Sequence, residues 1–460
     1  MAVIDEKFKK FYMGMYRAVA DIEMFKAFRF ALCSGLLIKA DIDKPEGVYR
    51  ECFSIAYLSM NYKELTGSDV LVRYINDLET YYGLPNGPVS EYYEDLLKDL
   101  RMDNVQNVFR VFSDIDLQRD ELPVFFDKLL NFTTANFGKE YGVGSTNPML
   151  ARLMGKLLEA KPGMTLYDGF CGTGRTILKA DNECRLYLQD SDRTVLAVAC
   201  VNMVVHGKEP KVVTSRDTFF NPIEEEGFDR IVTELPTTTK FLVDDARWLS
   251  DAYHVPEELV SGDTAGIMVV LEKLKEDGIA VVLVPVSLLF KSGRTEDFRR
   301  YLVQSGHLDC VISLPSGIIP HTGIASALLV MNKSKAEGDG IFFIDSGKLW
   351  IRSAAVDVAY LTEETLAELM DLYTARKETN ESTYIPKDVI LQGEVKLTPG
   401  TYLVKESEIK VADIKALRER SDKLYDRFVE VNKRLDWLRE QEKHRLVEMN
   451  KNALDRTNKP

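Results

Sequence analysis

Residues 166–175 read Leu166-Tyr167-Asp168-Gly169-Phe170-Cys171-Gly172-Thr173-Gly174-Arg175. The apolar run before Asp168 predicts a short strand, and the three glycines after it permit a tight turn with close backbone approach to a ligand. A helix is expected to begin near Thr173. In a parallel sheet, such a first strand-to-helix turn holds a nucleotide-like ligand; a glycine turn without any ligand is the alternative.

Short apolar runs alternate with helical stretches after this turn. We expect strands at 165–169, 185–190, 212–217, 228–235, 278–285, 308–315, 325–332 and 341–345. Helical periodicity marks the segments 192–206, 263–275 and 295–305. This alternation predicts a doubly wound α/β sheet with parallel strands. The runs 308–315 and 325–332 are joined by only about ten residues, which predicts an antiparallel hairpin at one edge of the sheet.

Two further regions flank this α/β domain, which we place at 141–400. Residues 1–140 carry apolar side chains at spacings of three and four and predict an all-helical N-terminal domain. Residues 401–460 are expected to hold a long C-terminal helix with a coiled-coil seam. That seam alternates steps of four and three through Leu424, Phe428, Val431, Leu435 and Leu438.

Composition excludes several classes of protein. Of the 460 residues, 45% are hydrophobic, which is typical of a globular chain and not of a disordered one. The longest apolar runs, such as 279–286, are far shorter than the ~20 residues that span a bilayer, and no secretory signal follows Met1. The six cysteines form no CxxC pair, and the five histidines have no metal-ligand spacing. We therefore expect a cytoplasmic protein with reduced thiols, no metal and no membrane partner.

The net charge of −13 argues against strong binding of nucleic acid by this chain alone. The charge is uneven, because residues 411–460 carry 13 basic and 10 acidic side chains. A chain of this kind is expected to reach DNA through a basic partner.

Acidic residues follow the second and third predicted strands. Asp190 lies about twenty residues after the glycine turn, where a carboxylate can accept hydrogen bonds from ribose hydroxyls. Asp217 could receive the amino group of an adenine. Taken singly, each could instead be an ordinary strand-end turn or helix cap.

In this order, the motifs resemble those of the modification subunit of type I restriction-modification systems, a family of S-adenosylmethionine-dependent DNA adenine-N6 methyltransferases. The likeness spans roughly 140–350. It rests on Gly144-Ser145-Thr146 before Leu150–Met154, Asp168–Gly174, Gln189-Asp190, Asn202 with His206-Gly207, Phe228-Asp229, Pro285 with Leu288–Phe290, and Leu314–Gly317 with Thr322–Ile324. The resemblance implies a class I, Rossmann-like methyltransferase sheet that binds S-adenosylmethionine.

The resemblance also assigns cofactor contacts. Asp190 would hold the ribose, and Asp217 would face the cofactor adenine. The remaining contacts would come from Thr146, Asp168, Phe170, Gly172, Thr173 and Gly174. Where the family carries an aromatic residue before the threonine, this chain has Ser145.

The family's catalytic signature is Asn-Pro-Pro followed by an aromatic residue, and here the sequence departs from it. The corresponding residues are Glu234, Leu235, Pro236 and Thr237. In the family, the Asn oxygen and the next carbonyl hold the adenine amino group, and the aromatic ring stacks on the flipped base. Glu234 cannot donate a hydrogen bond and is costly to desolvate, and Thr237 has no ring, although Phe241 lies four residues on.

Several functions remain open at this stage. The preferred interpretation is a methyltransferase-fold subunit of a type I-like DNA modification and defence complex, with a degenerate catalytic motif and a structural or regulatory role. The first alternative is a divergent but active adenine-N6 methyltransferase that uses Glu234. A methyltransferase acting on RNA or a small molecule is less favoured.

The resemblance also implies partners. Residues 411–460 would dock on a specificity subunit, with a second methyltransferase-like or restriction subunit and DNA in the complex. Basic side chains there, such as Arg418 and Arg434, could approach phosphates. The alternative is that this helix packs within its own chain.

Overall fold

The structure is a computed structural model that describes residues 2–19, 24–65, 68–84, 87–141, 146–225, 227–236, 239, 241–319, 324–336, 338–353, 356–403, 421, 423–427 and 429–434. The chain forms two compact units, Met1–Val404 and Lys405–Pro460.

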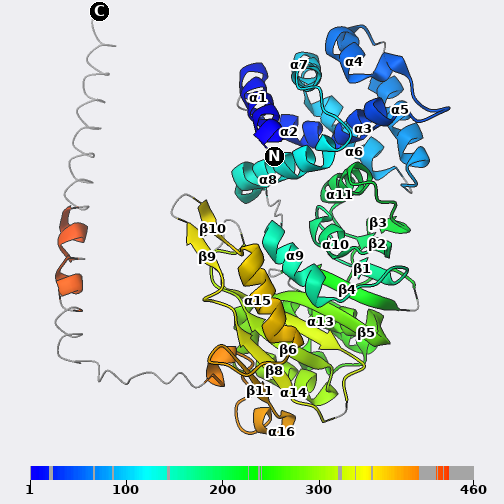
Figure 1. Cartoon of the computed structure of the whole chain (residues 1–460). Helices are drawn as coiled ribbons and strands as arrows, with labels where there is room; N and C mark the ends of the chain where they lie inside the picture. The colour runs from blue at the N-terminus through cyan, green and yellow to red at the C-terminus, as the bar shows by residue number, and fades with distance from the viewer. Residues whose placement is uncertain are drawn as a thin grey trace, which may run out of the picture. The chain divides into compact units, whose positions relative to one another are not determined.

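The N-terminal part of the first unit is helical, as predicted (Figure 1). Its helices are α1 (Ala2–Ala18), α2 (Met24–Cys33), α3 (Gly35–Asp43), α4 (Ile55–Asn61), α5 (Ser68–Tyr81), α6 (Pro88–Asp99), α7 (Met102–Ser113) and α8 (Glu121–Tyr141), with 3-10 turns at η2 (Glu51–Phe53) and η3 (Tyr62–Glu64). Buried aromatic rings join them, since Phe11 of α1 contacts Phe112 of α7 and Phe125 of α8. Glu79 caps the start of α6 by accepting the N–H groups of Val89 and Ser90.

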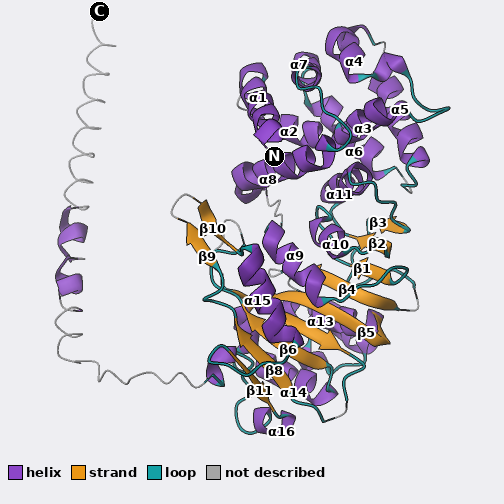
Figure 2. Ribbon diagram, viewed as in Figure 1, coloured by secondary structure: helices purple, strands orange, loops and turns teal. Residues whose placement is uncertain are grey.

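A mixed sheet forms the centre of the α/β part (Figure 2). Its order in the described part of the chain is β11-β8-β6-β7-β5-β4-β1-β2-β3. The strands are β1 (Thr165–Asp168), β2 (Arg185–Gln189), β3 (Val212–Thr214), β4 (Phe228–Glu234), β5 (Leu274–Pro285), β6 (Leu308–Ser313), β7 (Ser326–Asn332), β8 (Ile341–Asp345) and β11 (Ser382–Ile385). A separate antiparallel pair joins β9 (Ile351–Ser353) and β10 (Val356–Tyr360).

Helices cover both faces of this sheet. They are α9 (Pro148–Leu157), α10 (Arg175–Ala180), α11 (Arg193–Val205), α12 (Val243–Tyr253), α13 (Gly262–Lys273), α14 (Arg294–Ser305), α15 (Glu363–Thr374) and α16 (Lys387–Ile390), with η4 (Glu257–Leu259), η5 (Val286–Leu289) and η6 (Pro399–Thr401). Successive side chains of β5 pack on opposite faces of the sheet. Val281 and Leu283 join one apolar core, and Ala280 and Val282 join the other. Burial on both faces explains the nearly continuous apolar run in this strand.

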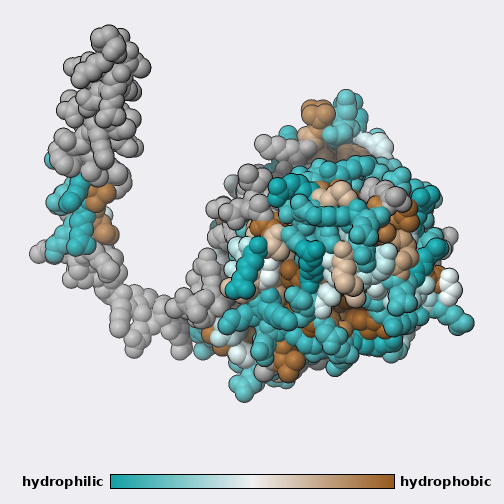
Figure 3. Space-filling view, turned by 90° about the horizontal axis from the view of Figure 1, so that it is seen from above, coloured by the Kyte–Doolittle hydropathy of each residue, from teal (hydrophilic) through white to brown (hydrophobic). Residues whose placement is uncertain are grey.

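The core that contains Val281 also contains the apolar residues of α1–α8. The helical N-terminal region packs against the α/β part through α11, which contacts α2, α3, α6 and α8. Seen from above, the surface is mainly hydrophilic, with apolar side chains in small groups (Figure 3).

The predicted α/β class is confirmed, and most strand positions agree within a few residues. β6 and β7 pair antiparallel as expected. The pair does not lie at the edge of the sheet, because β8 and β11 extend the sheet beyond β6 and β7 also pairs with β5. β3 ends at Thr214, so Asp217 lies in the following loop and not at the strand end.

In the second unit, the described residues between Ser421 and Arg434 are helical. The predicted seam residues Leu424 and Val431 are exposed there, and Phe428, Leu435 and Leu438 lie outside the described residues. None of the helices among the described residues is long and apolar enough to cross a membrane.

Candidate functional site

The glycine turn after β1 leaves space beside its backbone. Gly172 and Gly174 have φ angles of +52° and +74°, which favour glycine. A Cβ built on Gly172 would meet nothing within 4 Å. The Cys171 N–H donates to the Gln189 carbonyl oxygen at 3.0 Å, and α10 begins at Arg175, two residues later than predicted. The open cradle at Gly172 fits the close backbone approach that a nucleotide-like cofactor requires.

Asp168 ends β1 as a buried acid. Its Oδ1 accepts hydrogen bonds from the Thr233 hydroxyl at 2.8 Å and from the Phe170 N–H at 3.2 Å. Burial raises the pKa of Asp168 to about 8 although these hydrogen bonds lower it, and the nearby carboxylates of Glu234 and Asp190 add to the rise. The end of β1 therefore lies close to the ends of β2 and β4, and Asp168 holds a proton at neutral pH.

Asp190 is joined directly to the glycine turn. Its Oδ2 accepts the Gly172 N–H at 2.8 Å, and its Oδ1 accepts the Asp192 N–H at 2.9 Å. Burial raises the pKa of Asp190 in spite of these bonds. Each carboxylate oxygen has a second lone pair, so Asp190 can still accept a ligand hydroxyl.

Asp217 lies in an exposed loop, where its Oδ1 accepts the Phe219 N–H at 2.9 Å. Gln189, a residue that the sequence did not single out as a site residue, fixes this loop. Its buried amide donates to the carbonyl oxygens of Arg216 and Asn221. The loop is thereby tied to the end of β2, beside the glycine turn.

Glu234, at the end of β4, is bound by residues of its own chain. The Thr176 hydroxyl donates to Glu234 Oε1 at 3.3 Å, and Thr146 and Thr176 share a hydrogen bond at 2.9 Å. Burial raises the pKa of Glu234, whereas these two hydroxyls and the positive charge of Arg175 lower it. The carboxylate thus already has donors and a cation near it.

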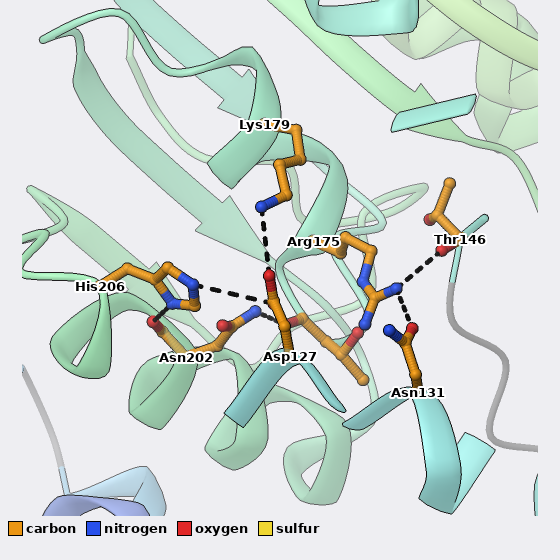
Figure 4. A network of polar contacts seen from close by, with 8 residues as sticks. Asp127, Asn131, Thr146, Arg175, Lys179, Asn202 and His206 are labelled. Atoms are coloured by element: carbon orange, nitrogen blue, oxygen red, sulfur yellow. Dashed lines mark hydrogen bonds and ion pairs between the residues drawn. The ribbon is translucent and has the colours of Figure 1, made fainter. Parts of the chain in front are cut away.

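Arg175 is the principal site residue that the sequence analysis missed. It is 2% exposed, and its Nη1 donates to Asn131 Oδ1 on α8 and to the Thr146 carbonyl oxygen (Figure 4). Among the residues that the structure describes, its Nε and Nη2 have no hydrogen-bond partner. A charged residue directly after the last glycine was the available signal, but nothing in the sequence indicated Asn131.

A second contact joins α8 to the helices of the site (Figure 4). Asp127 of α8 lies 3.3 Å from Lys179 Nζ and 3.7 Å from His206 Nε2. Burial raises the pKa of Asp127, but the His206 hydrogen bond and the Lys179 charge outweigh it and bring the pKa to about 2. Asn202 holds the turn from the other side, because its Nδ2 donates to the Thr173 carbonyl oxygen at 3.0 Å.

The residues that follow Glu234 lead away from β4. The Leu235 N–H donates to the Leu283 carbonyl oxygen at 3.3 Å, and its side chain is buried. Pro236 is half-buried, and Thr237 lies outside the described residues. Phe241 packs against the rings of Phe219 and Phe220, so the described contacts place it in an aromatic cluster.

The structure therefore brings together Asp168, Asp190, Glu234 and Thr146 around the turn, with Asp217 in the adjoining loop. In the described part of the chain, no group of three or more His, Cys, Asp or Glu side chains could hold a metal ion.

A doubly wound sheet, a glycine turn after its first strand and acids after the first two strands define a class I methyltransferase fold. The sequence model for N-6 DNA Methylase matches residues 117–410, and the chain belongs to that family. The resemblance stated from the motifs is thus confirmed.

Curated relatives are subunits of restriction enzymes. The type I restriction enzyme MpnII methylase subunit of Mycoplasma pneumoniae is 24% identical over 400 residues, covering 76% of this chain and 73% of that protein. The EcoEI methylase subunit of Escherichia coli is 23% identical over 384 residues, covering 77% of this chain and 70% of that protein.

Solved structures share the fold. The type I restriction-modification methyltransferase subunit from Streptococcus thermophilus matches with a TM-score of 0.69 at 18% identity, over 87% of this chain and 99% of that chain. A modification subunit of a type I restriction enzyme from Vibrio vulnificus matches with a TM-score of 0.61 at 15% identity, over 85% and 93% of the two chains.

Proposed function

We propose that this chain is the methyltransferase-fold subunit of a type I-like DNA adenine-N6 modification complex, that it binds S-adenosylmethionine, and that its own catalytic motif is degenerate. It would act there as a structural or regulatory subunit. The three segments 1–140, 141–400 and 401–460 would serve as helical domain, methyltransferase domain and docking helix.

The open cradle at Gly172 and the acids around it support the cofactor proposal. Asp190 would accept hydrogen bonds from the ribose hydroxyls, and Asp217 would accept the adenine amino group. Phe170, Thr173, Gly174 and Thr146 would line the remainder of the site, beside Asp168. The cofactor, when bound, supplies the methyl group.

The observation that carries the degenerate-site proposal is the environment of Glu234. An adenine amine needs two acceptors that hold its hydrogens so that its lone pair points at the methyl group. Glu234 Oε1 accepts from Thr176, and the Arg175 charge lies nearby. A carboxylate that is held in this way is poorly placed to bind a substrate amine, and three of the four signature positions are changed.

Calorimetry with S-adenosylmethionine tests the cofactor site. We expect wild type to bind, Asp190→Ala to weaken binding at least about tenfold, since it removes acceptors for ribose, and Asp192→Ala to leave it nearly unchanged. Asp192 is the matched control, because it is an exposed acid two residues away that caps α11. No binding by wild type would contradict the cofactor proposal.

Transfer of labelled methyl groups to DNA by the assembled complex tests catalysis. We expect Glu234→Ala to leave the activity of the complex unchanged. Glu234→Asn with Leu235→Pro and Thr237→Phe should raise the activity above that of the wild-type complex. The gain should be larger when Arg175→Met is added, because Arg175 would otherwise remain as a cation after Glu234 is removed.

The second candidate is an active methyltransferase that uses Glu234. The raised pKa of this partly buried carboxyl favours it, because a neutral carboxyl is less costly to keep beside a base. Wild-type methylation of adenine that Glu234→Ala abolishes would establish this candidate and exclude the degenerate site.

A further inference from the structure

The segment 241–262, between the end of β4 and the start of α13, supplies most of the lining of a groove of about 760 Å3. Leu242, Val243 and Ala246 line it near the start of α12, and Glu257, Glu258 and Val260 line it at and just after η4. Two of the lining residues approach each other closely, since a Cβ on Gly262 would come within 1.9 Å of the Thr239 carbonyl oxygen. This approach requires glycine at position 262.

Large apolar side chains are exposed on this segment. Leu242 is 76% exposed, Val243 is 70% exposed and Trp248 is 45% exposed. Two other residues of α12, Leu249 and Tyr253, are instead buried in the core. Exposed apolar residues that gather beside a groove are typical of a binding surface.

The charge around the groove is acidic. The sequence from 241 to 262 contains five acidic residues and one basic residue, Arg247. Arg247 lies 3.9 Å from Asp244 and 3.8 Å from Glu257, so its charge is already shared. Among the ion pairs of the described residues, none involves Glu258. Arg294 is the basic residue among those that line the groove.

We propose that this groove binds a basic amphipathic helix of a partner chain, with aliphatic side chains seated on Leu242 and Val243 and Lys or Arg side chains facing the glutamates. Charge complementarity selects this occupant. The five acids of segment 241–262 outnumber the two nearby cations, Arg247 and Arg294, so the surface around the groove attracts cations and repels the phosphates of a nucleic acid. A helix of this kind presents its apolar anchors at positions i, i+3, i+4 and i+7 on one face. This interface does not depend on whether the chain transfers methyl groups.

The test uses the full chain and a fluorescein-labelled synthetic helix with leucines at i, i+3, i+4 and i+7 and lysines elsewhere. Binding is followed by fluorescence anisotropy. We expect the helix to bind, and Glu257→Lys with Glu258→Lys to weaken binding by about tenfold or more. Leu242→Ser with Val243→Ser should weaken it about fivefold, because these changes remove apolar area.

The matched control is Glu224→Lys with Glu225→Lys. This is also an adjacent, exposed glutamate pair, and it precedes β4 at the opposite end from Glu234. The control changes the net charge of the chain by the same amount, so it should alter binding less than about twofold if the groove is the site. A scrambled peptide of the same composition should bind more weakly, since its leucines no longer share one face.

Three outcomes would overturn the proposal. The labelled helix fails to bind wild type, or the two glutamate reversals weaken it equally, which would indicate attraction by the overall charge alone. The third is that labelled single-stranded DNA binds wild type without the helix and that Leu242→Ser with Val243→Ser weakens this binding, which would make this a nucleic-acid surface. Circular dichroism and the Tm of each variant verify that these exposed substitutions leave the fold intact.

Discussion

Asp168 is a buried acid that binds a proton more tightly in the folded protein than in the unfolded chain. Its pKa is raised from 3.8 to about 8, mainly by burial. Between these two values the folded protein holds a proton that the unfolded chain releases, so the free energy of unfolding falls as the pH rises. This contribution is complete below about pH 4 and is lost as the pH approaches 8.

Replacing this acid should therefore flatten the pH profile of stability. We expect wild type to lose several degrees of Tm between pH 5 and pH 8.5, and Asp168→Asn to lose clearly less, because each pKa unit is worth ~1.4 kcal/mol. Thermal unfolding across this pH range is the measurement. The exposed Asp217→Asn serves as control and should follow wild type; an unchanged profile for Asp168→Asn would contradict the assignment.

Two features disfavour any side chain at Gly174: its positive φ angle and the close approach of the Met203 side chain. Its φ is +74°, and a Cβ there would lie 2.9 Å from Met203 Cε. Gly163 has a similar φ of +81° with nothing within 4 Å of a built Cβ.

Gly174→Ala should lower the free energy of unfolding by about 1–3 kcal/mol and Gly163→Ala by about 1 kcal/mol. The difference between the two variants measures the cost of moving Met203 and α11. Denaturant titration of both variants checks this, and equal losses would show that the Met203 side chain yields freely.

At the scale of elements, the site depends on how α8, α10 and β4 meet. Arg175 starts α10, donates to Asn131 on α8, and lies near Glu234 at the end of β4. The positive charge of Arg175 favours the ionised form of Glu234. Removing either group therefore changes the electrostatic surroundings of the other.

A double-mutant cycle with Arg175→Met and Glu234→Gln should therefore be strongly non-additive. We expect each single change to destabilise the protein, and the double variant to lose less than the sum by about 0.5–3 kcal/mol. Denaturant titrations of the four proteins measure this coupling. Additive losses would mean that the two charges do not interact in the folded state.

The sequence indicated most strands of the sheet but not which strands pair with one another. Apolar runs located β1, β2, β4 and β8 within a few residues, because strands buried on both faces are apolar throughout. It did not indicate β11 (Ser382–Ile385), whose short Ser-Thr-Tyr-Ile run resembles a loop. β11 forms because it pairs with β8 across nearly forty residues of sequence, and for this reason the antiparallel β6–β7 pair is not an edge.

At the scale of the whole molecule, Met1–Val404 is compact, and its helical and sheet regions share one apolar core. Residues 411–460 carry the proposed docking helix.

Deleting 411–460 should leave the Tm within about 2 °C of wild type, because the first unit keeps its core. The same deletion should abolish co-purification with a specificity subunit. Thermal unfolding and a pull-down with the tagged partner measure the two effects. Retention of the partner by the truncated chain would contradict the docking role of the helix.

The sequence by itself determined the fold class, the glycine turn and the acids Asp168 and Asp190, because these features follow from short local patterns and strand order. It also indicated the departure at Glu234 from the family's signature. Only the tertiary structure decided what surrounds that residue. Thr146, the α10 residues Arg175 and Thr176, and Asn131 of α8 come from three separate segments. Their contacts with one another and with Glu234 at the end of β4 arise only when the helical region packs on the α/β part and removes water from the charges between them.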